Sequence, residues 1–501
     1  MNITKTRLAF QVFFVGLFLF LAFVTAFDRL KGFPVSLFLE LDPLVGIGTS
    51  LTTHSLYRGL LWALPVVLLT LVLGRVFCGW VCPFGAIHHL IGWLSVRRSS
   101  PQQQVEGNRY RRINAFKYYL LVAFGAAALL GTLQIGLLDP IVTFYRSLST
   151  AVWPTVDQAT GSIFLRPPAY RLSWVFGSLF GLLLVLNVGW PRFFCRVLCP
   201  LGALMGLLGR FAWWRIDRDP AKCTDCDLCL KACEGAADPQ SHLRKAECFV
   251  CMNCLNDCQY GAISFRFLPS VTREVAHPDL RRRHVLLGAL AGVLFYPLSR
   301  ASGELTKNFD KAVIRPPGSL AEPEFLARCT KCEQCLRVCP TNVLQPTLFE
   351  AGLEGFWTPV MNNRMGYCEL NCVLCGQVCP TGAIERISLD RKLGLGEYRD
   401  RPIKVGTAFF DRGRCLPWAM DTHCVVCEEV CPTSPEAIFT RPVEVVSRNG
   451  TTLTLKQPYV DLERCTGCGI CEYACPVKDL AGVRVTAIGE TRSADRTLLL
   501  N

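Results

Sequence analysis

The sequence contains no Cys-x2-Cys-His motif, so covalent attachment of haem c is excluded. It also contains no isolated cysteine, because each of its 28 cysteines belongs to a group with short spacing. A small secreted domain held together by disulfides is excluded in turn, since such domains are short and lack spanning helices. Cysteines two or three residues apart are typical of chains in which several thiolates bind one metal centre. The cysteine pattern therefore predicts metal binding.

Charged residues are scarce: they make up 19% of the 501 residues, whereas apolar residues make up 51%. The formal net charge of +13 is compatible with a nucleic-acid partner. The Lys and Arg residues, however, cluster beside long apolar segments, which is the pattern of charges held at the cytoplasmic face of a membrane. We therefore expect contact with membrane lipid and no nucleic-acid partner.

Four apolar segments are long enough to cross a bilayer, and within hydrocarbon a helix satisfies its own backbone hydrogen bonds. The segments are 8–27, 59–77, 116–137 and 172–190. Basic residues precede the first segment, fill the loop between the second and the third, where Arg97 and Arg98 lie, and follow the fourth. The positive-inside rule then places the N-terminus and the region after the fourth helix in the cytoplasm. The sequence predicts a four-helix membrane domain in residues 1–212.

The membrane domain contains an internal repeat. Leu41-Asp42-Pro43-Leu44 precedes the second segment, and Leu138-Asp139-Pro140-Ile141 precedes the fourth. Both of these segments end in a Cys-x3-Cys-Pro-x-Gly-Ala motif, and the four thiols of the two motifs are Cys78, Cys82, Cys195 and Cys199. By the predicted orientation, these thiols lie at the cytoplasmic face. They either bind a further metal centre or act as redox-active or structural thiol pairs.

Residues 213–270 contain two cysteine runs with the spacing of a cytoplasmic two-cluster ferredoxin, in which the last cysteine of each run serves the other cluster. The runs are Cys223, Cys226, Cys229, Cys233 and Cys248, Cys251, Cys254, Cys258. Zinc is the competing metal, but zinc fingers rarely use four closely spaced thiols twice. Glu234 departs from the ferredoxin pattern, which has proline after this cysteine.

Residues 271–303 predict a membrane anchor with an export signature. Arg281-Arg282-Arg283-His284 leads into a short apolar segment, which resembles a twin-arginine signal. An ordinary fifth membrane helix is the alternative, and both interpretations place the rest of the chain in the periplasm. We expect the segment to remain as an anchor; cleavage after Ser299-Arg300-Ala301 is the other outcome.

Residues 304–501 predict a periplasmic domain with four more runs, which follow Arg315-Pro316-Pro317, interpreted here as a linker. Each run ends in Cys-Pro, and the proline supplies the turn that returns the chain to a second cluster. The ligands are Cys329, Cys332, Cys335, Cys339, Cys368, Cys372, Cys375, Cys379, Cys415, Cys424, Cys427, Cys431, Cys465, Cys468, Cys471 and Cys475. In the third run the first gap has eight residues, enough for a loop that faces a partner protein. The 24 ferredoxin cysteines together predict six [4Fe–4S] clusters.

The predicted fold class is multi-domain. An α-helical membrane bundle of four transmembrane helices, plus a fifth short signal-anchor helix, is joined to α+β ferredoxin domains of the bacterial type. The expected location is the bacterial cytoplasmic membrane, with the N-terminus in the cytoplasm and the C-terminal domain in the periplasm.

The first 270 residues resemble NapH and MauN in the four helices, both Cys-x3-Cys-Pro motifs and the ferredoxin that follows. The residues from about 281 onward resemble NapG and MauM, in motifs that include Arg414-Cys415-Leu416-Pro417-Trp418 and Cys427-Glu428-Glu429-Val430-Cys431-Pro432. The resemblance implies the electron-transfer component of a quinol dehydrogenase in anaerobic respiration. Its partners would be the quinol or quinone pool, a periplasmic cytochrome c or molybdenum-type reductase, and a cytoplasmic donor. The direction of electron flow stays open.

Two further expectations follow from resemblance. By similarity to four-cluster respiratory subunits, the outer two runs exchange their last cysteines, so that Cys475 completes the cluster of the first run and Cys339 that of the last. Sequential pairing is the alternative. Polyferredoxins with Cys-x3-Cys-Pro domains also resemble the NosR and FixG groups, which implies a second function: an electron-supplying maturation factor for a periplasmic metalloenzyme.

Quinol oxidation requires a proton acceptor beside the ring. Asp42, His54 and Asp139 are the candidates on the periplasmic side, although both Asp-Pro pairs are also typical of caps and turns. His88 and His89 either bind haem b or pack at the membrane face.

Overall fold

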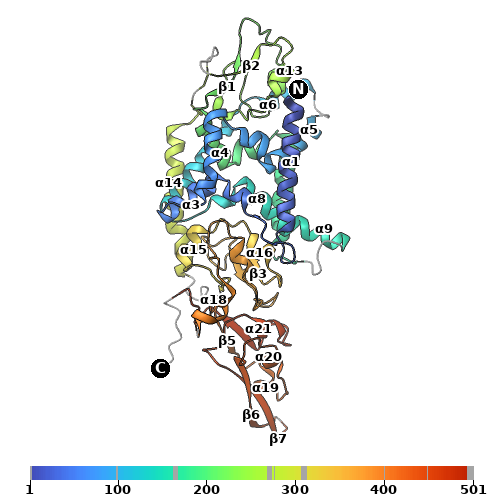
Figure 1. Cartoon of the computed structure of the whole chain (residues 1–501), viewed down its shortest axis with the longest axis vertical. Coiled ribbons are helices and arrows are strands. Elements are labelled where there is room, and N and C mark those ends of the chain that lie inside the picture. Colours follow the sequence, from blue (N-terminus) through green and yellow to red (C-terminus); the bar gives the residue numbers. More distant parts are fainter. Residues whose placement is uncertain are drawn as a thin grey trace.

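Long helices form the middle of the molecule and separate two cysteine-rich parts at its opposite ends (Figure 1). The structure is a computed structural model. It describes residues 3–96, 100–161, 168–267, 274–275, 277–305, 313–399, 401–447 and 449–493. The loop residues Arg97 and Arg98 and the predicted domain boundary at residue 270 lie outside these ranges.

The helical part contains the same order of elements twice, as the sequence repeat predicts. Each half has a helix that begins at an Asp-Pro pair, a longer apolar helix, one π-helical turn and a further helix. In the first half these are α3 (Pro43–Thr53), α4 (Leu60–Leu73), η1 (Phe77–Val81) and α5 (Pro83–Val96). In the second half they are α8 (Pro140–Ser147), α10 (Ser173–Gly189), η5 (Phe194–Leu198) and α11 (Pro200–Gly209). The other helices here are α1 (Ile3–Val24), α2 (Leu37–Glu40), α6 (Pro101–Asn108), η2 (Arg112–Ala115), α7 (Phe116–Leu129), η3 (Ile135–Leu137), η4 (Leu148–Val152), α9 (Trp153–Thr160) and α14 (Arg282–Leu305).

The four predicted membrane segments are helical, but four complete spans are not shown. Within the described residues, α1 is the one helix that is long and apolar enough to cross a membrane. α4 ends at Leu73 rather than at residue 77, because Gly74 has a φ of 82° and cannot continue the helix. α7 ends at Leu129 rather than at residue 137, just before Gly131 with its φ of 98°.

The segment with the arginine signature is one continuous helix, α14, which packs along α7. Gly288 and Gly292 lie at this contact. A Cβ at these positions would lie 2.9 Å from the Tyr119 carbonyl oxygen and 2.1 Å from the Ala123 carbonyl oxygen, respectively. Small residues four apart allow two helix backbones to approach this closely. The predicted anchor is therefore an integral part of the helical layer.

Replacing Gly292 with valine is expected to separate α14 from α7, because the added side chain has no room beside Ala123. Overpacking of this kind costs about 1–3 kcal/mol. The measurement is the melting temperature of the detergent-purified protein. Gly181→Val on α10 is the matched control, since no atom lies within 4 Å of a Cβ built there. Equal melting temperatures for the two variants would contradict the packing described.

The N-terminal cysteine-rich part is a small α+β unit. Strands β1 (Trp214–Arg218) and β2 (Ile263–Phe267) pair antiparallel, and both of its cysteine runs lie between them in sequence. Its short helices are α12 (Leu228–Lys231), η6 (Lys245–Glu247) and α13 (Asn253–Asp257).

The C-terminal cysteine-rich part consists of short helices and three antiparallel strand pairs. The pairs are β3 (Leu344–Pro346) with β4 (Pro359–Met361), β5 (Thr407–Phe410) with β8 (Val483–Thr486), and β6 (Ile438–Val446) with β7 (Thr452–Val460). The helices are α15 (Glu322–Arg328), α16 (Gln334–Val338), α17 (Leu374–Gln377), α18 (Leu389–Leu393), η8 (Gly396–Tyr398), α19 (Leu416–Ala419), α20 (Val426–Glu429) and α21 (Ile470–Ala474). Part of the eight-residue gap in the third run is thus the helix α19 rather than a loop.

Arg315-Pro316-Pro317, interpreted as a linker, is instead packed into this part. The Arg315 guanidinium is buried and donates to Glu322 at 2.6 Å, and Arg492 donates to the same carboxylate at 2.8 Å. Burial raises the pKa of Glu322, but these two guanidinium groups outweigh that effect and lower this pKa to about 2. The linker prediction is wrong, because an ionised carboxylate joins this segment to the C-terminal end of the domain.

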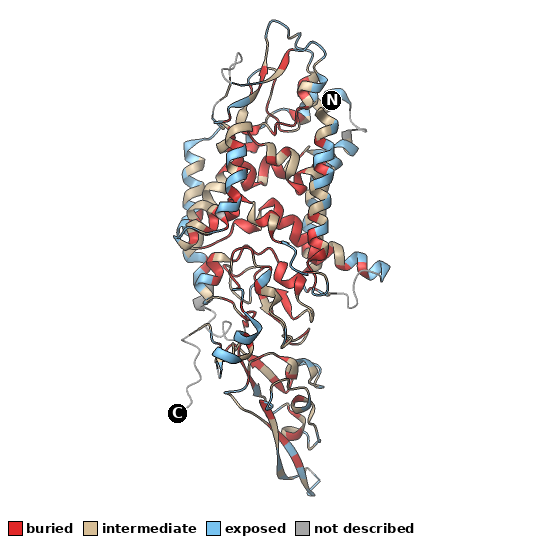
Figure 2. Ribbon diagram, in the orientation of Figure 1, coloured by how far each residue is buried: buried red, intermediate tan, exposed pale blue. Residues whose placement is uncertain are grey.

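Buried residues are concentrated inside the helical part and at its junction with α15 and α16 (Figure 2). One apolar core runs through this junction, from Phe18 and Phe84 to Phe325 and Leu336. The first part of the C-terminal unit is therefore packed directly against the helices.

Candidate metal centres

The backbone of four cysteine runs has the same unusual conformation. In each run with two residues between the first cysteines, the residues just before and just after the second cysteine have positive φ. These pairs are Asp225 and Asp227, Val250 and Met252, Lys331 and Glu333, and Gly467 and Gly469. Alternation with left-handed residues turns successive amide N–H groups toward a common point, which suits an anionic cluster. The runs that begin Cys368-x3 and Cys415-x8 lack this pair.

The last cysteine of several runs accepts a hydrogen bond from a backbone amide a few residues later. Ala237 N–H donates to Cys233 Sγ at 3.2 Å, and Ala262 N–H donates to Cys258 Sγ at 3.3 Å. Such bonds favour the thiolate. Burial, together with the neighbouring Cys332 thiol, nevertheless raises the pKa of Cys335 well above its usual value. These thiolates therefore need a cation such as iron, and the donor set fits a [4Fe–4S] cluster.

The structure groups the runs of the C-terminal part sequentially. Cys379, the last cysteine of the second run, lies close enough to affect ionisation of Cys329, Cys332 and Cys335. Cys339 in turn lies beside the second run, as its effect on Cys368 and Cys375 shows. These neighbours favour the sequential alternative over the outer exchange expected by resemblance.

The second pair of runs follows the same rule. Cys475 lies close enough to affect the ionisation of Cys415, and Cys431 lies close enough to affect the ionisation of Cys465 and Cys468. An antiparallel contact encloses each pair of runs: the bridge of Ser319 with Ile384 in the first case, and β5 with β8 in the second. β1 and β2 enclose the N-terminal pair in the same way, and there Cys233 lies beside the Cys248 run, as predicted.

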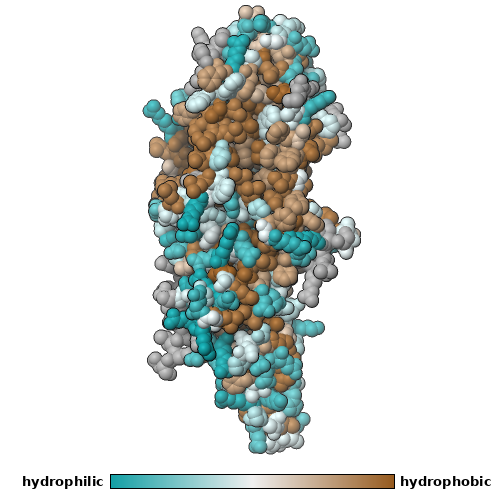
Figure 3. Space-filling model, viewed as in Figure 1, coloured by the Kyte–Doolittle hydropathy of each residue, from teal (hydrophilic) through white to brown (hydrophobic). Residues whose placement is uncertain are grey.

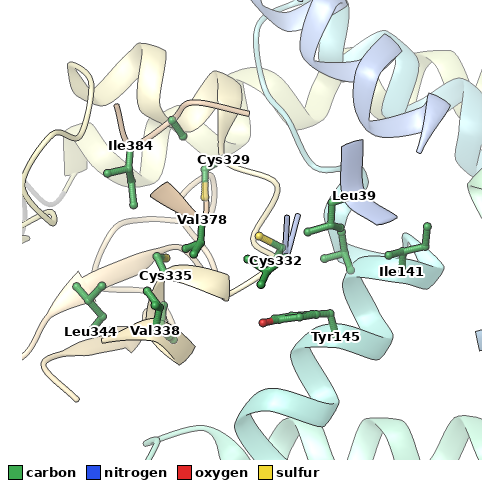
Figure 4. Packing of buried hydrophobic residues seen from close by; sticks show 14 of the residues in the cluster. Leu39, Ile141, Tyr145, Cys329, Cys332, Cys335, Val338, Leu344, Val378 and Ile384 are labelled. Carbon is green, nitrogen blue, oxygen red and sulfur yellow. The ribbon is translucent and has the colours of Figure 1, made fainter. Parts of the chain in front are cut away.

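The cysteine groups of the C-terminal part form a row that starts at the helices. Figure 4 shows Cys332 facing Tyr145 and Leu39 of the helical part. Thr52 Oγ1 donates to the Ala327 carbonyl at 2.6 Å at the same junction. Further along the row, Cys368 N–H donates to the Cys468 carbonyl at 2.8 Å, so the first pair of groups meets the second.

The Cys-x3-Cys-Pro motifs lie at the other end of the helical part. η1 and η5 carry Cys78 and Cys195, and the four motif thiols are mutual neighbours. The motif glycines allow this approach, since a Cβ at Gly85 would lie 2.7 Å from the Cys78 carbonyl oxygen. Gly202 N–H also donates to Cys199 Sγ at 3.1 Å.

Two arginines at this site were not among the predicted site residues. Arg75 and Arg192 stand three residues before the first cysteine of each motif, and the repeat itself would have revealed them. Each reaches the opposite half: a Cβ at Gly202 would lie 2.8 Å from Arg75, and one at Gly85 would lie 3.8 Å from Arg192. Both guanidinium groups lie over the ring of Phe249, at 4.7 and 4.9 Å. Phe249 follows Cys248, so the motif thiols lie next to the second N-terminal cysteine run.

An aromatic row connects the two ends of the helical part. The ring centroid of Phe194, which precedes Cys195, lies 4.9 Å from that of Phe84, and the Phe84 centroid lies 5.8 Å from that of Phe144. Phe144 stacks on Phe18 at 5.0 Å, and Phe18 contacts Tyr145, the residue that faces Cys332.

The candidate proton acceptors are not all brought together. Asp42 and Asp139 are buried N-caps of α3 and α8 and are electrostatic neighbours of each other. Ionisation of one buried carboxyl group disfavours ionisation of the other. His54 is exposed at the end of α3. His88 packs between Phe84 and Phe194, and His89 pairs with Glu234 at 3.2 Å.

Within the described ranges, no three His, Cys, Asp or Glu side chains converge as ligands of one metal ion. A cubane cluster holds its thiolates at four separate corners, farther apart than ligands of a single ion.

Comparison with known proteins gives two family matches. The model described as "4Fe-4S binding domain" matches residues 55–101 and 170–217, which contain the two Cys-x3-Cys-Pro motifs. The model described as "4Fe-4S dicluster domain" matches residues 328–383 and 400–478, one match for each sequential pair of runs. No solved structure matches.

Several curated proteins are similar to part of the chain. The ferredoxin-type protein MauM of Methylophilus methylotrophus is 32% identical over 42% of this chain and 88% of that protein. The ferredoxin-type protein NapG of Escherichia coli is 33% identical over 34% of this chain and 68% of that protein. The regulatory protein NosR of Pseudomonas aeruginosa is 32% identical over 45% of this chain, but over only 27% of its own length.

Proposed function

Because the chain belongs to the family of ferredoxin-type proteins that includes MauM and NapG, we propose that it carries electrons between the membrane quinol pool and a periplasmic partner. Six [4Fe–4S] clusters, held by the 24 cysteines of the runs, supply one-electron redox chemistry when bound. The partner is a cytochrome c or a molybdenum-type reductase. The helical part lies in the bacterial cytoplasmic membrane, with the N-terminal ferredoxin in the cytoplasm and the four-cluster part in the periplasm.

The surface of the helical part supports the membrane location. Figure 3 shows a band of apolar side chains across the middle of the molecule on the face in view. Large apolar residues are exposed on α4, α10 and α14, for example Leu61, Val185 and Leu286. Exposed residues of this kind, in a continuous area, are stable against lipid rather than water. The two cysteine-rich parts lie beyond opposite edges of this band (Figures 1 and 3).

One observation carries the proposed function: the first cysteine group of the C-terminal part is packed on the helical layer, and the others follow it in a row. The buried Thr52–Ala327 hydrogen bond and the contact of Cys332 with Tyr145 hold this group beside the membrane. Electrons that leave a lipid-soluble donor at this edge then have a protein-bound path outward. The chain's own residues position the groups, exclude water and hydrogen-bond the thiolates.

The Cys-x3-Cys-Pro thiols support a seventh centre. Cys78, Cys82, Cys195 and Cys199 gather across the two halves, and two buried guanidinium groups beside them balance negative charge. We include a metal centre at this site, next to the cytoplasmic ferredoxin, in the proposal.

The test is anaerobic purification followed by iron analysis and addition of a quinol analogue. Six clusters correspond to about two dozen iron atoms per chain, and quinol should bleach the cluster absorbance rapidly. Far fewer irons, or no bleaching by quinol in clusters that dithionite reduces, would overturn the proposal.

Similarity to NosR favours a second candidate, an electron-supplying maturation factor. This function predicts that a deletion strain accumulates a periplasmic metalloenzyme without its metal. The respiratory function instead predicts a fully metallated partner that receives no electrons.

A further inference from the structure

A cavity of about 580 Å³ lies where the helical layer meets the first cysteine group of the C-terminal part. Its walls come from the α2–α4 region, from Arg328 just before Cys329, and from the chain around Cys379. We call it the Tyr57 cavity and define it by Glu40, Tyr57, Trp62, Arg328, Cys379 and Arg386. We propose that the Tyr57 cavity is the binding site for quinol, an inference that rests on the proposed function.

The cavity joins lipid to a cluster ligand. At its outer side Leu56 is 90% exposed and Trp62 is 62% exposed, and Leu61 on the same turn of α4 is 70% exposed. In the proposed orientation these side chains face the edge of the hydrocarbon, where tryptophan is favoured. At its inner side the wall includes Cys379 itself. A ligand with an apolar tail and a redox-active head group fits this arrangement from end to end.

Polar groups surround the place for the ring. Glu40, Arg328, Arg386 and Cys379 line the same cavity as the Tyr57 hydroxyl. The Tyr57 hydroxyl donates to the carbonyl oxygen of Pro380, which holds the α3–α4 connection against the cysteine run. Glu40 accepts a hydrogen bond from Ser36 at 2.6 Å, which orients its carboxylate. The wall around the Tyr57 hydroxyl is mostly polar, and the apolar lining residues Leu56 and Trp62 lie on the exposed side, so the cavity offers a polar place for the head group and an apolar one for the tail.

The reaction balances with groups already named. Oxidation of a quinol to a quinone breaks two O–H bonds and releases two electrons and two protons. Cys329, Cys332, Cys335 and Cys379 would hold the cluster that supplies a one-electron acceptor beside the ring, and the runs further along the row would hold the next acceptors. One proton goes to the Glu40 carboxylate and the other to water at the cavity mouth. Glu40 thus takes the part that sequence analysis expected of Asp42 and Asp139, which do not line this cavity.

A second cavity, of about 870 Å³, lies on the other side of the helical layer. Its lining is rich in amides and charged groups, such as Gln103, Asn187 and Lys231, and includes no cysteine. It therefore offers a quinol no cluster ligand as a wall, and it serves as the comparison site.

The test uses the full chain in lipid nanodiscs. Trp62→Ala is expected to raise the apparent KM for quinol about tenfold, through loss of an aromatic contact. Glu40→Gln is expected to lower the rate of cluster bleaching by about 10²–10⁴-fold, the usual effect of removing a general base. Trp93→Ala in the second cavity is the matched control and should leave both parameters unchanged. Dithionite should reduce the clusters of all variants equally.

Photolabelling of the wild-type protein with an azidoquinone gives a readout that does not depend on any variant folding. The label should fall on the peptides that contain residues 55–62 or 376–386. Two results would overturn this inference and leave the proposed function intact. The first is quinol-dependent bleaching with the label on residues of the second cavity, and the other is full activity in both Trp62→Ala and Glu40→Gln. Absence of any bleaching by quinol would overturn the proposed function and the inference together.

Discussion

Replacing Cys379 with alanine is expected to remove one whole cluster and to stop quinol from reducing any other cluster in the C-terminal part. The reason is its place in the structure: Cys379 completes the group of Cys329, Cys332 and Cys335, which is packed on the helical layer. Loss of this group breaks the row at its first member. Iron content should fall by about four atoms per chain, and quinol-dependent bleaching of the other C-terminal clusters should fall to the background rate.

Cys475→Ala is the matched comparison, because it removes a cluster at the far end of the row. Iron should fall by the same amount, but quinol should still reduce the inner clusters of the C-terminal part. Electron paramagnetic resonance of the reduced protein also tests the pairing. Cys379→Ala and Cys329→Ala should remove the same signal. If Cys475→Ala removed that signal instead, the sequential grouping would be refuted.

Replacing Glu234 with glutamine is expected to loosen the N-terminal ferredoxin from the helical part. Its carboxylate lies 3.1 Å from Arg7 and 2.6 Å from Arg192, and both arginine side chains are almost fully buried. Burial raises the pKa of Glu234, but Arg192 and Arg7 outweigh that effect and hold this pKa well below its usual range. Glutamine removes the carboxylate nearest to both buried guanidinium groups, and breaking a buried ion pair in this way costs about 3–5 kcal/mol. Glu234 occupies the position at which the ferredoxin pattern has proline, and proline has no side chain able to make these bonds.

The measurement is hydrogen exchange of strands β1 and β2 in anaerobic, cluster-loaded protein. Exchange should rise strongly in Glu234→Gln. Asp219→Asn is the control, since its 3.9 Å pair with Lys222 is on the surface and contributes at most about 1 kcal/mol. Equal protection in the two variants would show that Glu234 does not fasten the ferredoxin to the helices.

Local sequence patterns account for the backbone conformation of the cysteine runs and for the starts of several helices. The interval Cys-x2-Cys-x2-Cys determines how the backbone wraps a cluster, and the paired positive φ values around Cys226 and Cys251 follow from it. Asp42-Pro43 and Asp139-Pro140, considered as proton acceptors with caps or turns as the alternative, begin two equivalent helices, because an aspartate N-cap acts on amides only two or three residues away. Apolar composition predicted the helices, but not where Gly74 and Leu129 end them.

Contacts between distant segments required the folded chain. In every run the last cysteine follows the third at the same interval of three residues, so this interval does not say which neighbouring cluster the last thiolate serves. The enclosing strand pairs indicate it. Arg75 reaches the other half of the repeat, and Glu234 occupies a position where a local pattern predicts only a turn. The Tyr57 cavity is built from segments more than 300 residues apart, Tyr57 and Pro380 among them. Short stretches of sequence thus predicted the cysteine runs and an iron–sulfur cofactor, whereas the neighbours of each run and the cavity beside the first group arise from packing, which no local spacing encodes.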